Sequence, residues 1–273
     1  MKPPPIKKSS KKKVSKKTFS IGKWSGDKTG EKIIIYGKSG IGKTTLSSLA
    51  PHPVFIGIDD GGRKIHHPKT GEELDRVEGV ETYQDVRDAL QQMGLYKNID
   101  TIIIDTATKL EQLAEEHMYK NIPHEKGYKV NSIEGYGYGK GYRHLRETML
   151  LLLQDFDRLV REGKNIVLLC QSAAGVRSNP AGDDFLEDGP RLYHSKTKEE
   201  NSVKLAYCEW ADHVVKLDYF NFKVTKDKKA VGLTERAIFV HPEVYFFAKS
   251  RTITEPVISF EKPNDDSFWR YLK

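Results

Sequence analysis

The residues with the clearest chemistry form a glycine-rich loop at positions 37–45. They are Gly37, Lys38, Ser39, Gly40, Ile41, Gly42, Lys43, Thr44 and Thr45. Glycines let a backbone curl so that successive N–H groups point at phosphate oxygens. In the G-x-x-x-x-G-K-S/T pattern, Lys43 would reach the β- and γ-phosphates, and the Thr44 hydroxyl would ligate Mg²⁺. An apolar run precedes the loop and a helix-compatible run follows it, which favours a nucleoside triphosphate site over an ordinary glycine turn.

A second candidate lies about 60 residues further on, where the apolar run 101–104 ends in Asp105. A carboxylate at the end of a buried strand holds the Mg²⁺ shell in phosphate-loop proteins, often through water. We therefore predict that Thr44 and Asp105 are the metal-binding residues and that ATP with Mg²⁺ is the cofactor.

These residues require a sheet whose strands end at one edge. Apolar runs predict strands at 32–36, 54–58, 101–104 and 165–170, and helical spacing predicts helices at 83–95, 110–119 and 143–162. Gln171 follows the fourth strand, at the edge where ligands of open α/β sheets gather. Residues 173–200 are polar and predict a long loop, and short runs at 210–218, 220–225, 236–240 and 245–249 predict further strands. The expected fold is α/β, a mostly parallel sheet flanked by helices with antiparallel C-terminal strands.

The net charge of +7 is concentrated at the N-terminus. Residues 1–17 hold eight lysines and no acid, which leaves 37 basic and 38 acidic residues in 18–273. We expect a disordered basic tail at 1–17 and a single folded domain at 18–273. The tail could bind polyanions through counterion release, or it could act only as a solubiliser.

The remaining composition excludes several classes of protein. No apolar run approaches the roughly 20 residues of a membrane span, and no apolar stretch follows the N-terminal lysines as in a secretory signal. Cys170 and Cys208 lie in apolar or aromatic surroundings, which predicts reduced core residues and a cytoplasmic location. For a phage-encoded protein this location is the host cytoplasm.

In its motifs the chain resembles the phage-encoded AAA-type, RecA-like ATPases, the compact Sak-type recombination proteins. The resemblance covers about residues 30–262 and rests on five features in order. They are the loop at 37–45, the strand that ends in Asp60-Gly61-Gly62, the strand that ends in Asp105-Thr106, the Tyr-Gly-Lys-Gly-Tyr run at 138–142, and the Glu-Trp-Ala-Asp run at 209–212 together with 248–251.

The resemblance implies a catalytic carboxylate on the strand after the loop helix. The family has Glu before the two glycines, whereas this chain has Asp60. Such a carboxylate would orient or deprotonate the attacking water. A shift of one residue would make Asp59 the base, and a turn-capping pair of aspartates is the structural alternative.

The resemblance also implies roles for three more polar residues. Gln171 occupies the position of a γ-phosphate sensor, and the loop 173–200 matches a segment that contacts single-stranded DNA, although its charges here are mixed. Lys249 and Arg251 match a cation pair that a RecA filament offers to a neighbour's ATP, with two solvated side chains as the alternative. The tyrosines of 135–142 could stack on bases, cover a core edge or contact another subunit.

These expectations describe a Mg²⁺-dependent, ATP-hydrolysing recombination protein that acts on single-stranded DNA, by annealing or strand pairing. The implied partners are single-stranded DNA, other copies of the chain in a ring or filament with ATP at the interfaces, and a single-strand-binding protein; no membrane is expected. One alternative is a nucleotide switch that hydrolyses little ATP and regulates a replication or recombination partner. A helicase-type motor is the other.

Overall fold

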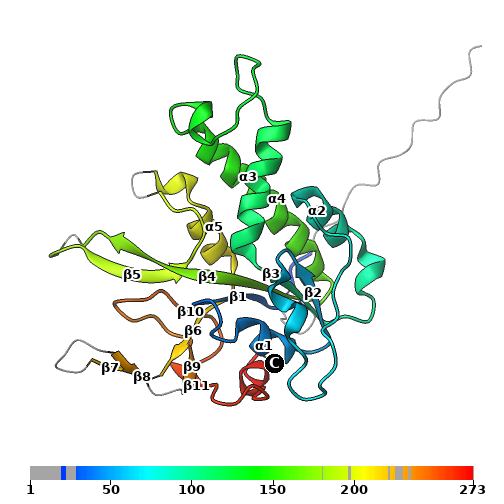
Figure 1. Ribbon diagram of the computed structural model, residues 1–273, viewed down its shortest axis with the longest axis vertical. Helices are drawn as coiled ribbons and strands as arrows, with labels where there is room; N and C mark the ends of the chain where they lie inside the picture. The colour runs from blue at the N-terminus through cyan, green and yellow to red at the C-terminus, as the bar shows by residue number, and fades with distance from the viewer. Residues whose placement is uncertain are drawn as a thin grey trace, which may run out of the picture.

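The computed structural model describes residues 20–22, 29–179, 181–195, 198–220, 222–224, 230–232 and 235–272. The predicted tail at 1–17 lies outside these residues, and so does the side chain of Asp60. The described chain forms a central sheet with helices on both faces (Figure 1).

The central sheet has the strand order β11-β9-β6-β1-β4-β3-β2, and the neighbours from β6 to β2 run parallel. These strands are β1 (Lys32–Gly37), β2 (Pro53–Gly57), β3 (Thr101–Asp105), β4 (Asn165–Arg177) and β6 (His213–Tyr219). The antiparallel additions are β9 (Arg236–Phe239), β10 (Lys249–Ser250) and β11 (Val257–Ser259). The sheet confirms the predicted mostly parallel α/β fold with antiparallel C-terminal strands.

Both faces of the parallel strands are buried, which explains their nearly continuous apolar sequences. In β1, Ile34 and Tyr36 face one core while Ile33 and Ile35 face the other. The first core is covered by α2 (Tyr83–Gln91), α3 (Ala107–Asn121), α4 (Lys140–Arg161) and α5 (Val203–Trp210). The second is covered by α1 (Lys43–Ser48) and α6 (Ser267–Arg270), which lie on the opposite side in Figure 1.

Local sequence signals set the limits of these helices. Thr82 and Asp85 form a capping box that begins α2, and Gly163, with φ of 83°, follows the end of α4. Helix α1 has only six residues because Pro51 and Pro53 follow it, as the sequence predicts. Short 3₁₀ segments complete the connections. They are η1 (Asp60–Lys64), η2 (Met93–Tyr96), η3 (Glu134–Tyr136) and η4 (Glu199–Asn201).

The prediction of one long loop at 173–200 is wrong. Strand β4 continues to Arg177 and pairs antiparallel with β5 (Phe185–Pro190), from Ser172 opposite Pro190 to Arg177 opposite Phe185. This hairpin projects from the body (Figure 1). Residues 173–177 of β4 are exposed and β5 is only partly buried, so the segment lacks the apolar alternation by which a strand is predicted.

The predicted strand at 210–218 begins later, as β6 at His213, and Trp210 belongs to a helix instead. Before β6 the chain forms helix α5, which begins where the Ser202 hydroxyl accepts a hydrogen bond from the N–H of Leu205. The predicted strand at 245–249 is reduced to β10, preceded by isolated bridges at Phe246. The predicted strand at 220–225 is present as β7 (Phe222–Val224), which pairs with β8 (Ala230–Gly232).

Candidate nucleotide site

The glycine-rich loop leaves the sheet from a central position, because β1 lies between β4 and β6. Gly37 is the last residue of β1 and is in register with Gln171 of β4. A Cβ atom on Gly37 would lie 2.3 Å from the Leu217 carbonyl oxygen, so only glycine fits there. The loop therefore turns directly above the carboxyl ends of three strands.

Lys43 is buried inside this loop, with 6% of its surface exposed. Its ammonium donates to the carbonyl oxygens of Gly37 and Lys38 at 2.9 Å each, and to Oε1 of Gln171 at 3.3 Å. Burial lowers the pKa of Lys43, and the nearby Asp105 carboxylate opposes that shift. The loop thus encloses a positive charge that is paired only with neutral oxygens at hydrogen-bond distance.

Thr44 and Asp105 meet as the sequence predicts. The Thr44 hydroxyl donates to Oδ2 of Asp105 at 2.8 Å, and the Asp105–Thr106 peptide bond is cis. Burial raises the pKa of Asp105, although the hydrogen bond from Thr44 lowers it. A hydroxyl and a carboxylate oxygen at this spacing are hard oxygen donors of the kind that Mg²⁺ prefers, so the residues present fit the ion.

The two candidate catalytic carboxylates follow β2 at the same edge of the sheet. Asp59 is exposed and caps η1, since its Oδ1 accepts a hydrogen bond from the N–H of Gly61 at 3.0 Å. Its negative charge adds to the rise in the pKa of Asp105, and it opposes the larger lowering of the pKa of Lys43 by burial. Asp60 is the first residue of η1. The backbone therefore places both residues just after the carboxyl end of β2, and the described side-chain interactions with the loop are those of Asp59.

Gln171 lies where a γ-phosphate sensor is expected, beside Lys43. Its N–H donates to the Thr108 hydroxyl at 3.1 Å, and Thr108 in turn donates to the Arg191 carbonyl at 3.1 Å. The Arg191 N–H donates back to the Gln171 carbonyl at 2.8 Å. These bonds join Gln171 to α3 and to Arg191 at the end of the β4–β5 hairpin. Because Gln171 also accepts from Lys43, they connect the glycine-rich loop to the same elements. Sequence reasoning missed Thr108, which carries no motif of its own.

The structure does not bring Lys249 and Arg251 to the loop of the same chain. In the sheet, Lys249 of β10 is opposite Val214 of β6, and Val214 is in register with Ile34 of β1. Lys249 is therefore level with the middle of β1 and not with the loop, which begins three residues later. Its ammonium donates to the carbonyls of Cys208, Glu209 and Ala211 at 2.9, 3.2 and 2.6 Å, where it caps the end of α5. Arg251 pairs with Asp212 at 3.0 Å and keeps 60% of its side chain exposed.

The tyrosine–glycine run has mainly structural contacts. Tyr136 is buried, and Tyr142 stacks on Tyr193 with ring centroids 4.3 Å apart. A Cβ atom on Gly141 would lie 2.1 Å from the Ile133 carbonyl oxygen. Tyr138 alone among these residues points into solvent, with 96% of its surface exposed.

Glu111 of α3 is partly buried beside the segment that follows β5. Its Oε1 accepts a hydrogen bond from the N–H of Tyr193 in that segment at 2.8 Å. Burial raises the pKa of Glu111 from 4.5 to about 7. A carboxyl with a raised folded pKa contributes stability that is present below pH 4.5 and is lost as the pH rises through 7.

We expect Glu111→Gln to flatten this pH dependence, because an amide stays neutral and still accepts the Tyr193 hydrogen bond. Between pH 5 and 8 the free energy of unfolding should fall by about 2 to 3 kcal/mol less in the variant than in the parent. Urea denaturation of both proteins at the two pH values measures the difference. Equal falls would show that Glu111 ionises normally.

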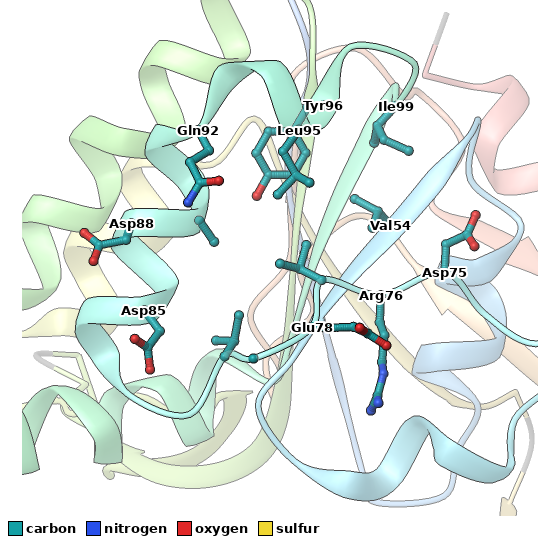
Figure 2. A pocket seen from close by; sticks show the side chains of 14 residues that line it. Val54, Asp75, Arg76, Glu78, Asp85, Asp88, Gln92, Leu95, Tyr96 and Ile99 are labelled. Atoms are coloured by element: carbon teal, nitrogen blue, oxygen red, sulfur yellow. The ribbon is translucent and has the colours of Figure 1, made fainter.

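A cavity of about 760 Å³ lies elsewhere. Figure 2 shows it between α2 and the segment 75–80, with Val54 and Tyr96 on its wall. It contains none of the predicted site residues. Among the described residues, no helix combines the length and apolar character needed to cross a membrane. Cys170 and Cys208 are buried free thiols, as predicted.

Comparison with known proteins gives one family. A family model described as an AAA domain matches residues 29–252. No curated protein matches. Among solved structures, a KaiC-like protein from the hyperthermophilic archaeon Pyrococcus horikoshii is similar, with 14% identity, a TM-score of 0.42, and coverage of 86% of this chain and 88% of that one.

Proposed function

The chain belongs to the AAA domain family, and we propose that it is a Mg²⁺-dependent ATPase whose nucleotide state controls a contact with single-stranded DNA. The observation that carries the ATPase proposal is the convergence of Lys43, Thr44, Asp105 and Gln171 at the end of β1. Phosphoryl transfer in phosphate-loop proteins uses these functional groups: an ammonium, a hydroxyl, a carboxylate and an amide. Here they form two hydrogen-bonded pairs, Lys43 with Gln171 and Thr44 with Asp105.

Each residue has a part that its contacts support. Lys43 exchanges its neutral loop carbonyls for the β- and γ-phosphates, which are stronger partners for a buried cation. Thr44 and Asp105 would hold Mg²⁺, which neutralises charge on the phosphates when bound. Asp60, or Asp59 one residue earlier, orients the attacking water and accepts its proton. The Gln171 amide hydrogen-bonds the γ-phosphate.

The proposal of single-stranded DNA as the substrate rests on the resemblance to phage-encoded recombination ATPases and on the β4–β5 hairpin. The hairpin begins at Ser172, the residue after the proposed sensor, so a shift of Gln171 is passed directly to its base. Arg177 within it is paired with Glu187 at 2.6 Å, which leaves little free positive charge for phosphates. We therefore assign most of the electrostatic attraction to the lysine tail.

A nucleotide switch with little hydrolysis is the second candidate, and the contacts of Lys249 favour it. Three carbonyls already hold its ammonium, so it is poorly placed to act on a neighbour's ATP. If copies of the chain form a ring or filament with ATP at the interfaces, Arg251 is the cation that reaches across, because its ion pair with Asp212 is exposed. The shorter Asp60 in place of the family's Glu also favours slow turnover.

The rate of ATP hydrolysis with and without single-stranded DNA distinguishes these candidates. The proposed function predicts stimulation by DNA, as expected when the hairpin reports DNA to Gln171. A slow rate that DNA leaves unchanged would favour the switch and contradict the DNA-dependent function.

Deletion of residues 1–17 should weaken DNA binding and make it less dependent on salt. If all eight lysines contact single-stranded phosphates, the slope of log K against log salt should change by up to about 6, at about 0.7 for each contact. Binding titrations at several salt concentrations measure the slope. The same slope for both proteins would make the tail a solubiliser.

A further inference from the structure

Arg236 lies against the outside of the glycine-rich loop, although it comes nearly 200 residues later. Strand β9 runs antiparallel to β6, so its first residue, Arg236, is opposite Tyr219 at the carboxyl end of β6. This is the edge from which Gly37 leaves β1. There, one guanidinium nitrogen (Nη1) donates to the carbonyl oxygen of Ile41 at 3.0 Å.

Two further contacts hold this guanidinium in place, and a backbone hydrogen bond holds the residue itself. Its central carbon lies 4.7 Å from the ring centroid of Phe260, which is 1% exposed. The second terminal nitrogen donates to the carbonyl oxygen of Glu261 at 3.4 Å, and the N–H of Phe260 donates to the Arg236 carbonyl at 2.9 Å. The arginine is thus packed between the loop and residues 260–261, which directly follow strand β11.

The contact has a direct consequence for Gly42. In a trans peptide the C=O and the following N–H point in opposite directions. Because the Ile41 carbonyl faces Arg236, the Gly42 N–H faces away from it, and within the described residues it has no protein acceptor. A Cβ on Gly42 would lie 2.5 Å from Nη1 of Arg236, and φ here is 111°. The backbone conformation therefore favours glycine, and any side chain at this position would displace the guanidinium of Arg236.

We propose that Arg236 is a positioning residue of the phosphate site: it fixes the Ile41–Gly42 peptide so that the Gly42 N–H is directed at a bound phosphate before the nucleotide arrives. This proposal rests on the proposed nucleotide site and adds the C-terminal strands to it. Without the arginine, the peptide can rotate, and part of the binding free energy must be used to order it.

Equilibrium binding of ATP with Mg²⁺ to the full chain tests the proposal. Arg236→Met keeps the packing on Phe260 but loses the hydrogen bond and the charge. It should raise Kd by roughly 10- to 100-fold, the range for hydrogen bonds to charged groups, with a smaller effect on kcat. Arg236→Lys should recover part of the loss, because an ammonium can also donate to the Ile41 carbonyl.

Arg87→Met is the matched control, since Arg87 is a partly buried arginine of α2 that pairs with Asp155 at 2.7 Å. It should lower the melting temperature and leave Kd unchanged. The proposal is overturned if Arg236→Met is folded with parental Kd, or if Arg236→Lys binds no better than Arg236→Met. If Lys43→Ala also binds ATP normally, the nucleotide site itself is misplaced, and this outcome separates the two failures.

Discussion

Lys43→Ala should weaken ATP binding by at least about 30-fold, the lower end of the effect of removing one partner of a buried charge pair. The side chain is buried, and within the described part of the chain its hydrogen-bond partners are two loop carbonyls and the Gln171 amide oxygen. Alanine removes the point charge from the β- and γ-phosphates and leaves the loop glycines in place. Calorimetric or fluorescence titration with ATP measures the loss.

Lys97→Ala is a suitable control because it removes the same charge from an exposed position at the end of η2. Its affinity for ATP should equal that of the parent. If Lys43→Ala melts like the parent and still binds ATP with parental affinity, the assignment of the phosphate loop is wrong.

Asp60→Asn should keep ATP binding and reduce turnover by roughly 10²- to 10⁴-fold, the usual contribution of a general base. Asp60→Glu should be tolerated, and it should be as fast as the parent or faster, because it restores the residue and the reach found in the family. Steady-state and single-turnover rates at saturating ATP measure both effects.

Asp59→Asn is the control for the position of the base. Asparagine caps a helix as well as aspartate does, so η1 should remain while the charge near Lys43 and Asp105 is lost. A large loss of turnover in Asp59→Asn alone would place the base one residue earlier. Parental rates in both variants would make the pair structural and favour the nucleotide switch.

The sequence predicts those site residues whose positions follow from a short motif or from the end of a strand. Lys43 and Thr44 belong to one short motif, and Asp105 ends a strand whose apolar residues identify it. Parallel strands bring their carboxyl ends to one edge, so the contact between Thr44 and Asp105 follows from the strands alone. Gln171 is found in the same way, because it follows the apolar run 165–170 that forms the first part of β4.

The contacts that sequence did not predict depend on register across distant strands. Arg236 reaches Ile41 because β9 is antiparallel to β6 and begins opposite Tyr219, and no local pattern fixes that pairing. The role of Lys249 as the cap of α5 could not be predicted either, because α5 itself was not predicted. In the β4–β5 hairpin, residues 173–177 are exposed and β5 is only partly buried, so neither strand shows the apolar alternation that predicts a strand.

We propose that this chain hydrolyses ATP at the site formed by Lys43, Thr44 and Asp105. The most direct test is the ATPase rate of the full chain with Mg²⁺ and after chelation of the ion, with Lys43→Ala measured beside it to exclude a contaminating enzyme. We expect hydrolysis by the parent that requires Mg²⁺ and is abolished both by the chelator and by Lys43→Ala. Hydrolysis that persists in Lys43→Ala, or a parent that releases no phosphate with Mg²⁺ in the presence or absence of single-stranded DNA, would contradict the claim.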